Sequence, residues 1–286
     1  MSSARVGHGP APAPASAATT HWGAEALWQQ LDPLLPGLSV EVVARTDSTN
    51  TRLLERARHG RDTQPCLLVA EHQTAGRGRL GREWVGAVGA SLSFSLALPM
   101  APRAWSGLSL AVGLALADAL EPLALGSPRI VLKWPNDLWL LDGPGRGRKL
   151  GGILIETLSV GERRLCVVGV GLNVLPQSAH GPSAGSACLQ EIYPGISAPA
   201  ALATVAVPLV RSLLKFAQTG FALFLAGYAR RDLLAGLAVS TTAPGVPHGV
   251  AEGVDEHGAL CVRAGVVHRL VSGEVSVRLA PAGAAA

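Results

Sequence analysis

One stretch of the sequence combines positive charge and backbone freedom in a way that suits an anionic ligand. It runs from Glu71 to Trp84 and reads EHQTAGRGRLGREW. Arginine is a permanently charged fork that grips carboxylate or phosphate, and glycine lets the backbone approach such a group. No acidic residue lies between Gln73 and Arg82. The loop is therefore predicted to close over an anion, the plain alternative being a solvated basic hairpin tip. Its arginines and small turn-formers are Arg77, Arg79, Arg82, Ala75, Gly76, Gly78 and Gly81.

Polar motifs at the ends of other predicted strands could complete the same site. Ligands of α/β sheets bind beyond strand ends, so these motifs are expected to converge on one pocket. The motifs are Asp47–Asn50 (DSTN), Gln73, Lys133–Asp137 (KWPND), Lys149 and Gly169–Asn173 (GVGLN).

Each of these motifs also has a purely structural interpretation. DSTN is typical of a helix cap, and Asp137 of a turn cap. Lys133 could be an edge lysine whose stem lies along apolar surface, and Lys149 part of a solvated basic turn. GVG is not a dinucleotide-binding signature, because no helix start follows it, and by itself it indicates close backbone packing.

The composition indicates a globular, mildly basic chain. The chain has 286 residues, which is enough for one large domain or one and a half. Its hydrophobic content of 48% and charged content of 15% are typical of a globular protein. A formal charge of +4 is compatible with anionic ligands but too small to indicate a nucleic-acid partner. The cysteines form no C-x-x-C pair, so we expect neither disulfides nor a zinc site, and reduced thiols in the cytoplasm fit best. They are Cys66, Cys166, Cys188 and Cys261.

The sequence patterns favour neither a signal peptide nor a membrane-spanning helix. Residues 1–20 lack the apolar core of a signal peptide and are predicted to form a disordered Ala/Pro-rich tail. The most apolar window, Leu108–Leu125, is interrupted by Asp118, Glu121 and Pro122, which favours a buried helix over a membrane span.

Sequence periodicity places the motifs between strands and helices. β-branched or alternating patterns predict strands at 39–45, 65–73, 90–99, 130–134, 138–141, 149–157 and 163–174. Cap residues and glycine stops predict helices at 24–31, 51–60, 106–120 and over most of 199–228. DGPGRGR (142–148) is expected to be a turn. From about Leu233, short strands with turn pairs predict a small β-barrel.

Taken together and in order, DSTN, EHQTAGRGRLGREW, KWPND, RKLGGILIE and GVGLN resemble the motifs of biotin protein ligases, also called biotin–[acetyl-CoA-carboxylase] ligases. The resemblance covers about Val40 to Leu279, and the arginine loop with KWPND is its most specific part. It implies an α+β class II synthetase-like fold, with a mixed-sheet catalytic domain and packed helices in 21–232. A small SH3-like β-barrel is expected in 233–286. The form resembled is the short one, without an N-terminal DNA-binding domain.

The resemblance implies a two-step reaction. ATP activates biotin to biotinyl-5′-AMP, and biotin then passes to one lysine of the biotin carboxyl carrier domain of acetyl-CoA carboxylase. Attack of a carboxylate on a phosphate brings two anions together, so fixed cations and Mg²⁺ must offset the repulsion. The catalytic residues implied are Lys133, Lys149 and Arg79, with Asp137 to orient or deprotonate the carrier lysine.

The resemblance also assigns the binding residues. The flat ureido ring of biotin needs donors and acceptors, and the apolar arm needs Trp84 and room beside small residues. The biotin-binding set is Ser48, Thr49, Asn50, Gln73, Arg77, Gly78, Arg79, Trp84, Lys149, Gly152, Gly169 and Gly171. The ATP-binding set is Arg79, Lys133, Trp134, Asn136, Lys149 and Asn173, with the two asparagines facing the nucleotide or its Mg²⁺. No metal site built from protein ligands alone is expected.

Three alternative functions are weighed against the sequence. A lipoate or octanoate ligase or transferase of related fold is the alternative enzyme, although its ligand lacks the ureido ring. A DNA-binding regulator is disfavoured, because about forty residues before the first strand are too short for a winged helix. A nucleic-acid-binding barrel lacks aromatic platforms after Tyr228. A homodimer is left open, and neither Leu80 in the loop nor the Gly/Ser-rich segment Gln177–Cys188 has an assigned role.

Overall fold

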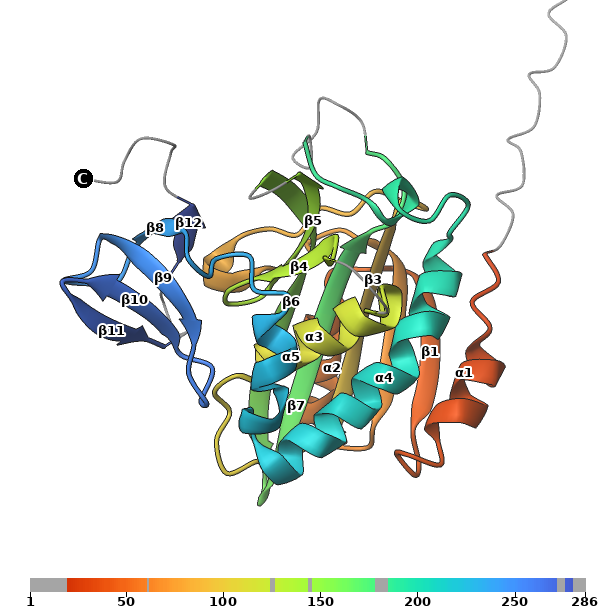
Figure 1. Ribbon diagram of the computed structural model, residues 1–286. Coiled ribbons are helices and arrows are strands. Elements are labelled where there is room, and N and C mark those ends of the chain that lie inside the picture. Colours follow the sequence, from red (N-terminus) through yellow and green to blue (C-terminus); the bar gives the residue numbers. More distant parts are fainter. Residues whose placement is uncertain are drawn as a thin grey trace, which may run out of the picture.

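The computed structural model describes residues 20–60, 62–123, 127–143, 146–177, 185–271 and 276–279. The tail predicted for residues 1–20 lies outside this range except for Thr20, and the turn pair Ser272–Gly273 lies outside it altogether. Within the described residues the elements form two sheets with helices packed against the larger one (Figure 1).

A seven-stranded mixed sheet is the centre of the molecule. Its strand order is β1-β2-β3-β7-β6-β5-β4, with β1 and β2 parallel and the other neighbours antiparallel. A long hairpin of β6 and β7 forms its middle, from the strands that the sequence predicted at 149–157 and 163–174. The strands are β1 (Ser39–Thr46), β2 (Cys66–Gln73), β3 (Ser91–Pro99), β4 (Ile130–Lys133), β5 (Asp137–Gly143), β6 (Arg146–Val160) and β7 (Arg163–Asn173).

The alternation of β3 separates an apolar face of the sheet from a polar one. Successive side chains of a strand point to opposite faces. Leu92, Phe94 and Leu96 therefore enter the main core. Ser91, Ser93 and Ser95 point to the other face, where they are buried. The serine face is the one that can carry hydrogen-bonding chemistry.

Helices cover the two faces unequally. α1 (Ala24–Leu31), α3 (Leu108–Leu120) and α4 (Ala198–Thr219) pack on the apolar face, whereas α2 (Thr49–Gly60) lies behind the sheet (Figure 1). α4 is long and apolar enough to span a membrane by length and composition alone. Its apolar face packs on α3 and the main core, which accounts for that composition.

The C-terminal region forms a second, antiparallel sheet in the order β11-β10-β9-β8-β12. Short α5 (Leu225–Ala229) precedes it. The buried Arg231 ties this junction to α3 and β4 by bonding Asp118, Glu121 and the Ile130 carbonyl. The strands are β8 (Ala238–Thr241), β9 (His248–Val254), β10 (Leu260–Ala264), β11 (Val266–Leu270) and β12 (Val277–Leu279).

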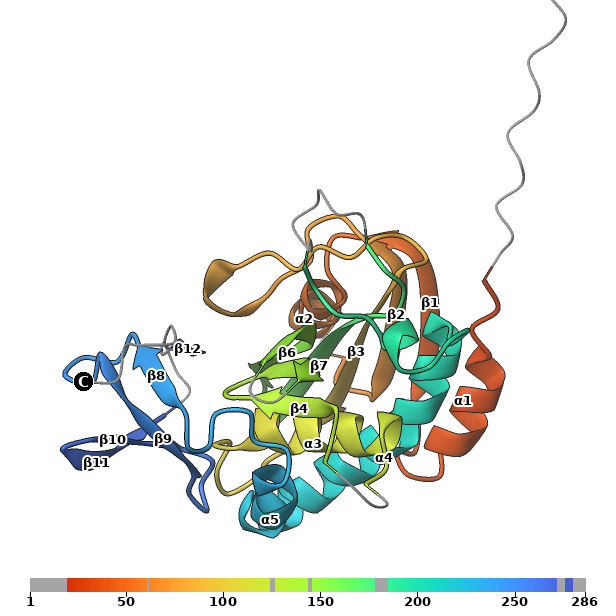
Figure 2. The same ribbon diagram turned by 45° about the horizontal axis from the view of Figure 1, so that its top comes forward.

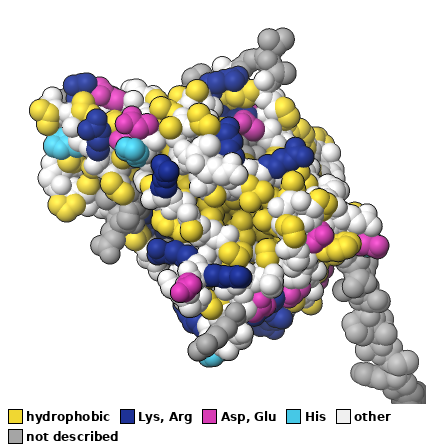
Figure 3. Space-filling model, turned by 90° about the horizontal axis from the view of Figure 1, so that it is seen from below, with side chains coloured by type: hydrophobic (Ala, Val, Ile, Leu, Met, Phe, Trp, Pro, Cys, Tyr) yellow, Lys and Arg dark blue, Asp and Glu magenta, His cyan; other side chains and the backbone are white. Residues whose placement is uncertain are grey.

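The predicted α+β class is confirmed, with the expected mixed sheet and a C-terminal antiparallel sheet. One local prediction was wrong: Arg146–Arg148 are not part of a turn, because β6 begins at Arg146 and Gly143 already pairs with it. The boundary at residues 232 and 233 stays a prediction. Seen from below, Lys and Arg side chains are spread around a central apolar area, in keeping with the small net charge (Figure 3).

Candidate active site

One cavity of about 140 Å³ collects nearly all of the residues that the sequence singled out. It lies on the polar face of the sheet, under the segment between β2 and β3, which reaches toward the C-terminal sheet (Figure 2). Every predicted catalytic and binding residue except Asn173 lines it. These are Ser48, Thr49, Asn50, Gln73, Arg77, Gly78, Arg79, Trp84, Lys133, Trp134, Asn136, Asp137, Lys149, Gly152, Gly169 and Gly171.

The sequence argument expected a pocket beyond the strand ends, and this is correct only in part. Gly152 and Gly169 belong to the interior of β6 and β7, so the sheet face itself forms the floor. The physical reason is the mixed topology. Antiparallel neighbours do not align their carboxyl ends at one edge, and small residues in the middle of the strands leave space instead.

A hydrogen-bonded cluster forms the end of the cavity at the start of α2. Gln73 Oε1 accepts from the Thr49 backbone N–H at 2.7 Å and from its hydroxyl at 3.0 Å. Ser95 Oγ lies 2.6 Å from both Thr49 Oγ1 and Asn50 Oδ1. Ser48 Oγ also accepts from the Thr51 N–H at 3.4 Å, so DSTN caps the helix and lines the cavity at once. Amide and hydroxyl groups fixed in this way suit a flat polar ligand.

Two glycines of β7 make room for protein side chains rather than leaving open space. A Cβ at Gly169 would come within 2.3 Å of Asn50 Oδ1, and one at Gly171 within 2.3 Å of the Trp84 ring. Only glycine therefore lets Asn50 and Trp84 lie flat against the strand. The Trp84 indole N–H reaches Ser93 Oγ at 3.3 Å.

The arginine loop is folded as a narrow hairpin over the cavity. Trp84 N–H bonds the Gly76 carbonyl at 2.8 Å, and Gly78 N–H bonds that of Arg82 at 2.7 Å. A Cβ at Gly76 would lie 2.3 Å from the Trp84 carbonyl oxygen, which explains the glycine there. Leu80 at the tip has a left-handed φ of 58°, unusual for a branched residue, and its side chain is 50% exposed.

The three arginines of the loop point to different partners. Arg77 Nη2 pairs at 3.1 Å with Glu156, which lies outside the loop on β6. Glu156 also accepts from Asn50 Nδ2 at 3.0 Å. Arg79 Nη1 donates to Asn136 Oδ1 at 3.3 Å, and burial lowers the pKa of its guanidinium. Arg82 Nη2 donates to Ser276 Oγ at 3.2 Å, on the C-terminal sheet side.

Lys133 brings a buried cation to the cavity wall. Its Nζ donates to the Val277 carbonyl at 2.8 Å and lies 5.2 Å from the centre of the Trp139 ring. Burial lowers the pKa of Lys133, the nearby Asp137 opposes that effect, and Lys149 adds to it. Among the described residues one carbonyl accepts from this desolvated ammonium, which keeps capacity for an incoming anion.

Lys149 and Asp137 form an ion pair inside the cavity. Lys149 Nζ donates to Asp137 Oδ1 at 2.7 Å, with side chains 41% and 19% exposed. The pair lies where β5 and β6 change register, between Leu138 and Trp139. Such bulges re-aim side chains and are common beside active sites.

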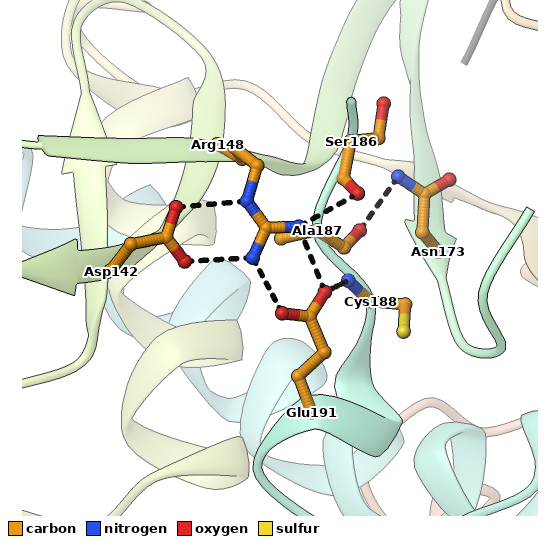
Figure 4. Close-up of polar contacts among 7 residues, drawn as sticks. All are labelled: Asp142, Arg148, Asn173, Ser186, Ala187, Cys188 and Glu191. Atoms are coloured by element: carbon orange, nitrogen blue, oxygen red, sulfur yellow. Dashed lines mark hydrogen bonds and ion pairs between the residues drawn. The ribbon is translucent and has the colours of Figure 1, made fainter. Parts of the chain in front are cut away.

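Asn173 is the predicted residue that the structure does not bring into the cavity. Its Nδ2 donates to the Ala187 carbonyl at 3.1 Å, and its Oδ1 accepts from Gln177 Nε2 at 3.1 Å. β7 ends at Asn173, and the chain returns beside it, which takes up the amide (Figure 4).

Sequence reasoning missed several residues that line the cavity or bond the side chains lining it. Glu156 gave a usable signal, because a charged residue in an apolar strand needs a partner. Ser95 lies in the alternating serines of β3, which indicate the face of the sheet it points to but not which residues it contacts. Ser276 and Val277 reach the site from the C-terminal sheet, and nothing local marks them.

A second cavity, of about 460 Å³, adjoins the first. The two share Arg79 and Asn136, and the second continues along Ile153 and Ile155 of β6 to Trp105. Its apolar walls could take an aliphatic chain. Among the described residues no group of three His, Cys, Asp or Glu side chains could hold a metal ion.

The comparisons with known proteins agree with this geometry. Residues 42–173 match the biotin/lipoate A/B protein ligase family, and residues 242–278 match the biotin protein ligase C-terminal domain. A biotin–[acetyl-CoA-carboxylase] ligase of Mycobacterium tuberculosis is 37% identical, over 85% of this chain and 86% of its own length. The bifunctional ligase/repressor BirA of Escherichia coli is 34% identical, over 86% and 76%.

Solved structures give the same result. A biotin protein ligase from Aquifex aeolicus, in complex with biotin and ATP, superposes with a TM-score of 0.69 at 30% identity. The match covers 84% of this chain and 99% of that one. This chain therefore belongs to the biotin protein ligases of the biotin/lipoate A/B protein ligase family.

Proposed function

We propose that the protein activates biotin with ATP to biotinyl-5′-AMP and transfers the biotinyl group to a lysine of the biotin carboxyl carrier protein of acetyl-CoA carboxylase. The observation that carries the proposal is one cavity with two chemically distinct ends. Thr49, Asn50 and Gln73 offer fixed polar groups at one end, and Lys133 and Lys149 offer cations at the other.

The polar end fits the ureido ring of biotin. A site whose buried donors and acceptors are already fixed rejects ligands that would leave them unpaired. Lipoate has no ureido group and would leave the polar groups of Ser48, Thr49 and Asn50 facing an apolar ring. Biotin is therefore the favoured substrate, in agreement with the relatives, which are named as biotin ligases.

The cationic end fits the first reaction step. The biotin carboxylate attacks the α-phosphate of ATP, forming a carbon–oxygen–phosphorus anhydride and releasing pyrophosphate. Lys149, Lys133 and Arg79 would offset the negative charge that gathers there. Mg²⁺ prefers carboxylate and amide oxygens together with phosphates, and Asp137 and Asn136 supply such oxygens in the cavity. When bound, the ion would neutralise phosphate charge.

The second step needs the carrier lysine to reach the acyl carbon as a neutral amine. The adjoining cavity beside Arg79 supports a route for its aliphatic stem, with Ile153, Ile155 and Trp105 as walls. Attack by the amine forms an amide and releases AMP. Asp137 lines the first cavity next to Asn136, which belongs to the shared wall, and it would orient the amine or take its proton once Lys149 is drawn to the phosphate.

The decisive experiment uses the full chain with ATP, Mg²⁺, a carrier domain and either biotin or lipoate. We expect the intact mass of the carrier to rise by one biotinyl group with biotin and to stay unchanged with lipoate. Omission of ATP should abolish the change. Equal labelling by lipoate, or no labelling by biotin, would refute the assignment.

Location and assembly belong to the proposal as well. Four free cysteines, three of them buried, are in keeping with a cytoplasmic enzyme. We propose no DNA binding, which a gel shift with biotin-gene operator DNA would test. A homodimer is left open and is decided by light scattering with and without biotin.

A further inference from the structure

The guanidinium of Arg148, next to the cavity residue Lys149, makes five hydrogen bonds. Nε and Nη2 bond the two oxygens of Asp142 at 2.8 and 2.7 Å. Nη1 and Nη2 bond the two oxygens of Glu191 at 3.1 and 2.6 Å, and Nη1 also bonds the Ser186 carbonyl at 3.1 Å. The five N–H groups of arginine thus face five acceptors (Figure 4).

These contacts join three parts of the chain. Asp142 belongs to β5, Arg148 to β6, and Ser186 and Glu191 to the segment that follows β7. Glu191 Oε1 also accepts from the Cys188 N–H at 2.9 Å, so it shapes the short 3₁₀ turn Leu189–Glu191. The segment 186–191 is therefore fixed to the β5–β6 hairpin from two sides.

That segment holds the backbone of Lys149. The β6–β7 ladder ends at the pair Gly151 and Leu172, so Lys149 has no partner from β7. The Ala187 N–H takes over and donates to the Lys149 carbonyl at 2.9 Å. On the other side the β5–β6 register shifts next to Lys149, which weakens the ladder there. Ala187 is thus the contact that completes the support of this stretch.

We propose that Arg148 is a positioning residue that, together with Asp142 and Glu191, sets the location of Lys149 in the cavity. The inference rests on the proposed function. Because the three side chains are 30–42% exposed, their ion pairs contribute little to global stability. Their effect is local, on the strand that carries the Lys149 ammonium to Asp137.

The first test compares Arg148→Ala with Arg146→Ala, which removes an exposed guanidinium two residues earlier in the same strand. We expect Arg148→Ala to lower kcat of biotin-dependent ATP–pyrophosphate exchange by about 10- to 100-fold, the range found when supporting residues of a site are lost. The calorimetric Kd for biotin should stay within about twofold, since the polar end is untouched. Arg146→Ala should change neither quantity. Equal kcat in both variants would overturn the proposal.

A double-mutant cycle separates positioning from general damage. If Arg148 acts through Lys149, adding Arg148→Ala to Lys149→Ala should lower exchange by less than about threefold further. Arg148→Lys should not rescue, because an ammonium cannot bond both carboxylates as a planar fork does. A full additional loss in the Lys149→Ala background would contradict the inference.

A readout without catalysis keeps this inference distinct from the proposed function. Amide hydrogen exchange of Ala187 should become at least about tenfold faster in Arg148→Ala and remain unchanged in Arg146→Ala. We call the bonds by which Arg148, Asp142 and Glu191 hold segment 186–191 the Arg148 clamp. Unchanged hydrogen exchange at Ala187 would refute this clamp even if the enzyme is a biotin ligase. A wild-type protein without pyrophosphate exchange would instead refute the proposed function, while the Ala187 result still decides the clamp.

Discussion

At the scale of single residues, the ion pair of Lys149 and Asp137 governs how the site can work. In the cavity each neutralises the other at 2.7 Å. Under the proposed function, an entering phosphate oxygen would compete with Asp137 for the ammonium, so that Lys149 would serve the first step and leave Asp137 for the second. A cation and an acid with successive roles need to be neighbours, as they are here.

Loss of the Lys149 charge tests this view. We expect Lys149→Ala to cut biotin-dependent pyrophosphate exchange by about a hundredfold or more, because a preorganised charge contact in an enclosed site is lost. Biotin binding, measured by calorimetry, should change far less. A near-normal exchange rate in this variant would remove Lys149 from the phosphate site.

Arg79 is expected to matter for holding the intermediate. It spans both cavities, bonds Asn136 and is partly withdrawn from water. Arg79→Ala should leave a folded enzyme that releases biotinyl-AMP at least about tenfold faster, equivalent to a charged hydrogen bond of about 1.4 kcal/mol or more. Dialysis with labelled biotin and ATP measures the retention. Retention equal to wild type would argue against the loop assignment.

At the scale of elements, close approach decides how the site is built. β7 can support the site only because two of its residues lack side chains, which lets Asn50 of α2 and Trp84 of the loop rest on the strand. The helix start, the loop and the strand are thereby locked to one another. The cavity is thus a product of packing between elements as much as of the polar residues.

The Gly171→Ala variant tests this packing. Its Cβ would overlap the Trp84 ring at 2.3 Å, so we expect unfolding free energy to fall by about 1–3 kcal/mol, as in overpacked cores. Displaced into the cavity, Trp84 should also weaken biotin binding about tenfold or more. Gly143→Ala in β5 is the control, because a Cβ there meets nothing within 4 Å. Equal stability and biotin affinity in both variants would show that Trp84 moves without cost.

At the scale of the whole molecule, the C-terminal region contributes to the wall of the candidate active site. Val277 holds Lys133, Ser276 bonds Arg82 of the loop, and the Trp134 indole donates to the Gly258 carbonyl at 3.1 Å. The junction between the two sheets runs along Leu132, which exchanges backbone bonds with Arg231 and Leu233. How this junction is held therefore bears directly on Lys133.

Asp232, between those two residues, gives the junction a pH dependence. Burial raises its pKa to about 6, and one of its oxygens has no hydrogen-bond partner within the part of the chain that the structure describes. Native Asp232 keeps its proton where the unfolded chain has lost it, so its contribution to stability falls as pH rises from about 4 to 6. At about 1.4 kcal/mol per pK unit, the difference from the ordinary 3.8 corresponds to about 3 kcal/mol at pH 7.

Asp232→Asn should remove this dependence. We expect the variant to gain up to about 3 kcal/mol relative to wild type between pH 4 and pH 7, measured by urea unfolding. The exposed Glu25→Gln serves as control for charge removal. A variant that tracks wild type at both pH values would show that Asp232 is not protonated in the native protein.

The sequence by itself determined most of the elements and the fold class, and of the residues that it singled out for chemistry all but Asn173 line the cavity. Strand and helix signals are local, and the alternating pattern of 90–99 predicted β3 from its own residues. The motifs and their order also indicated the protein family. Arg79, Lys133, Lys149 and Asp137 were selected from residue type and position in the chain, and the fold brings them together.

Only the tertiary structure decided which of these residues bond one another. The Glu156 partner of Arg77, the diversion of Asn173 to Ala187 and the Arg148 clamp all join residues from different elements. So do the contacts of Ser276 and Val277 with the loop and Lys133. Side-chain pairing depends on register, bulges and the return path of the chain. These are settled by packing across the whole molecule, and no local pattern records them.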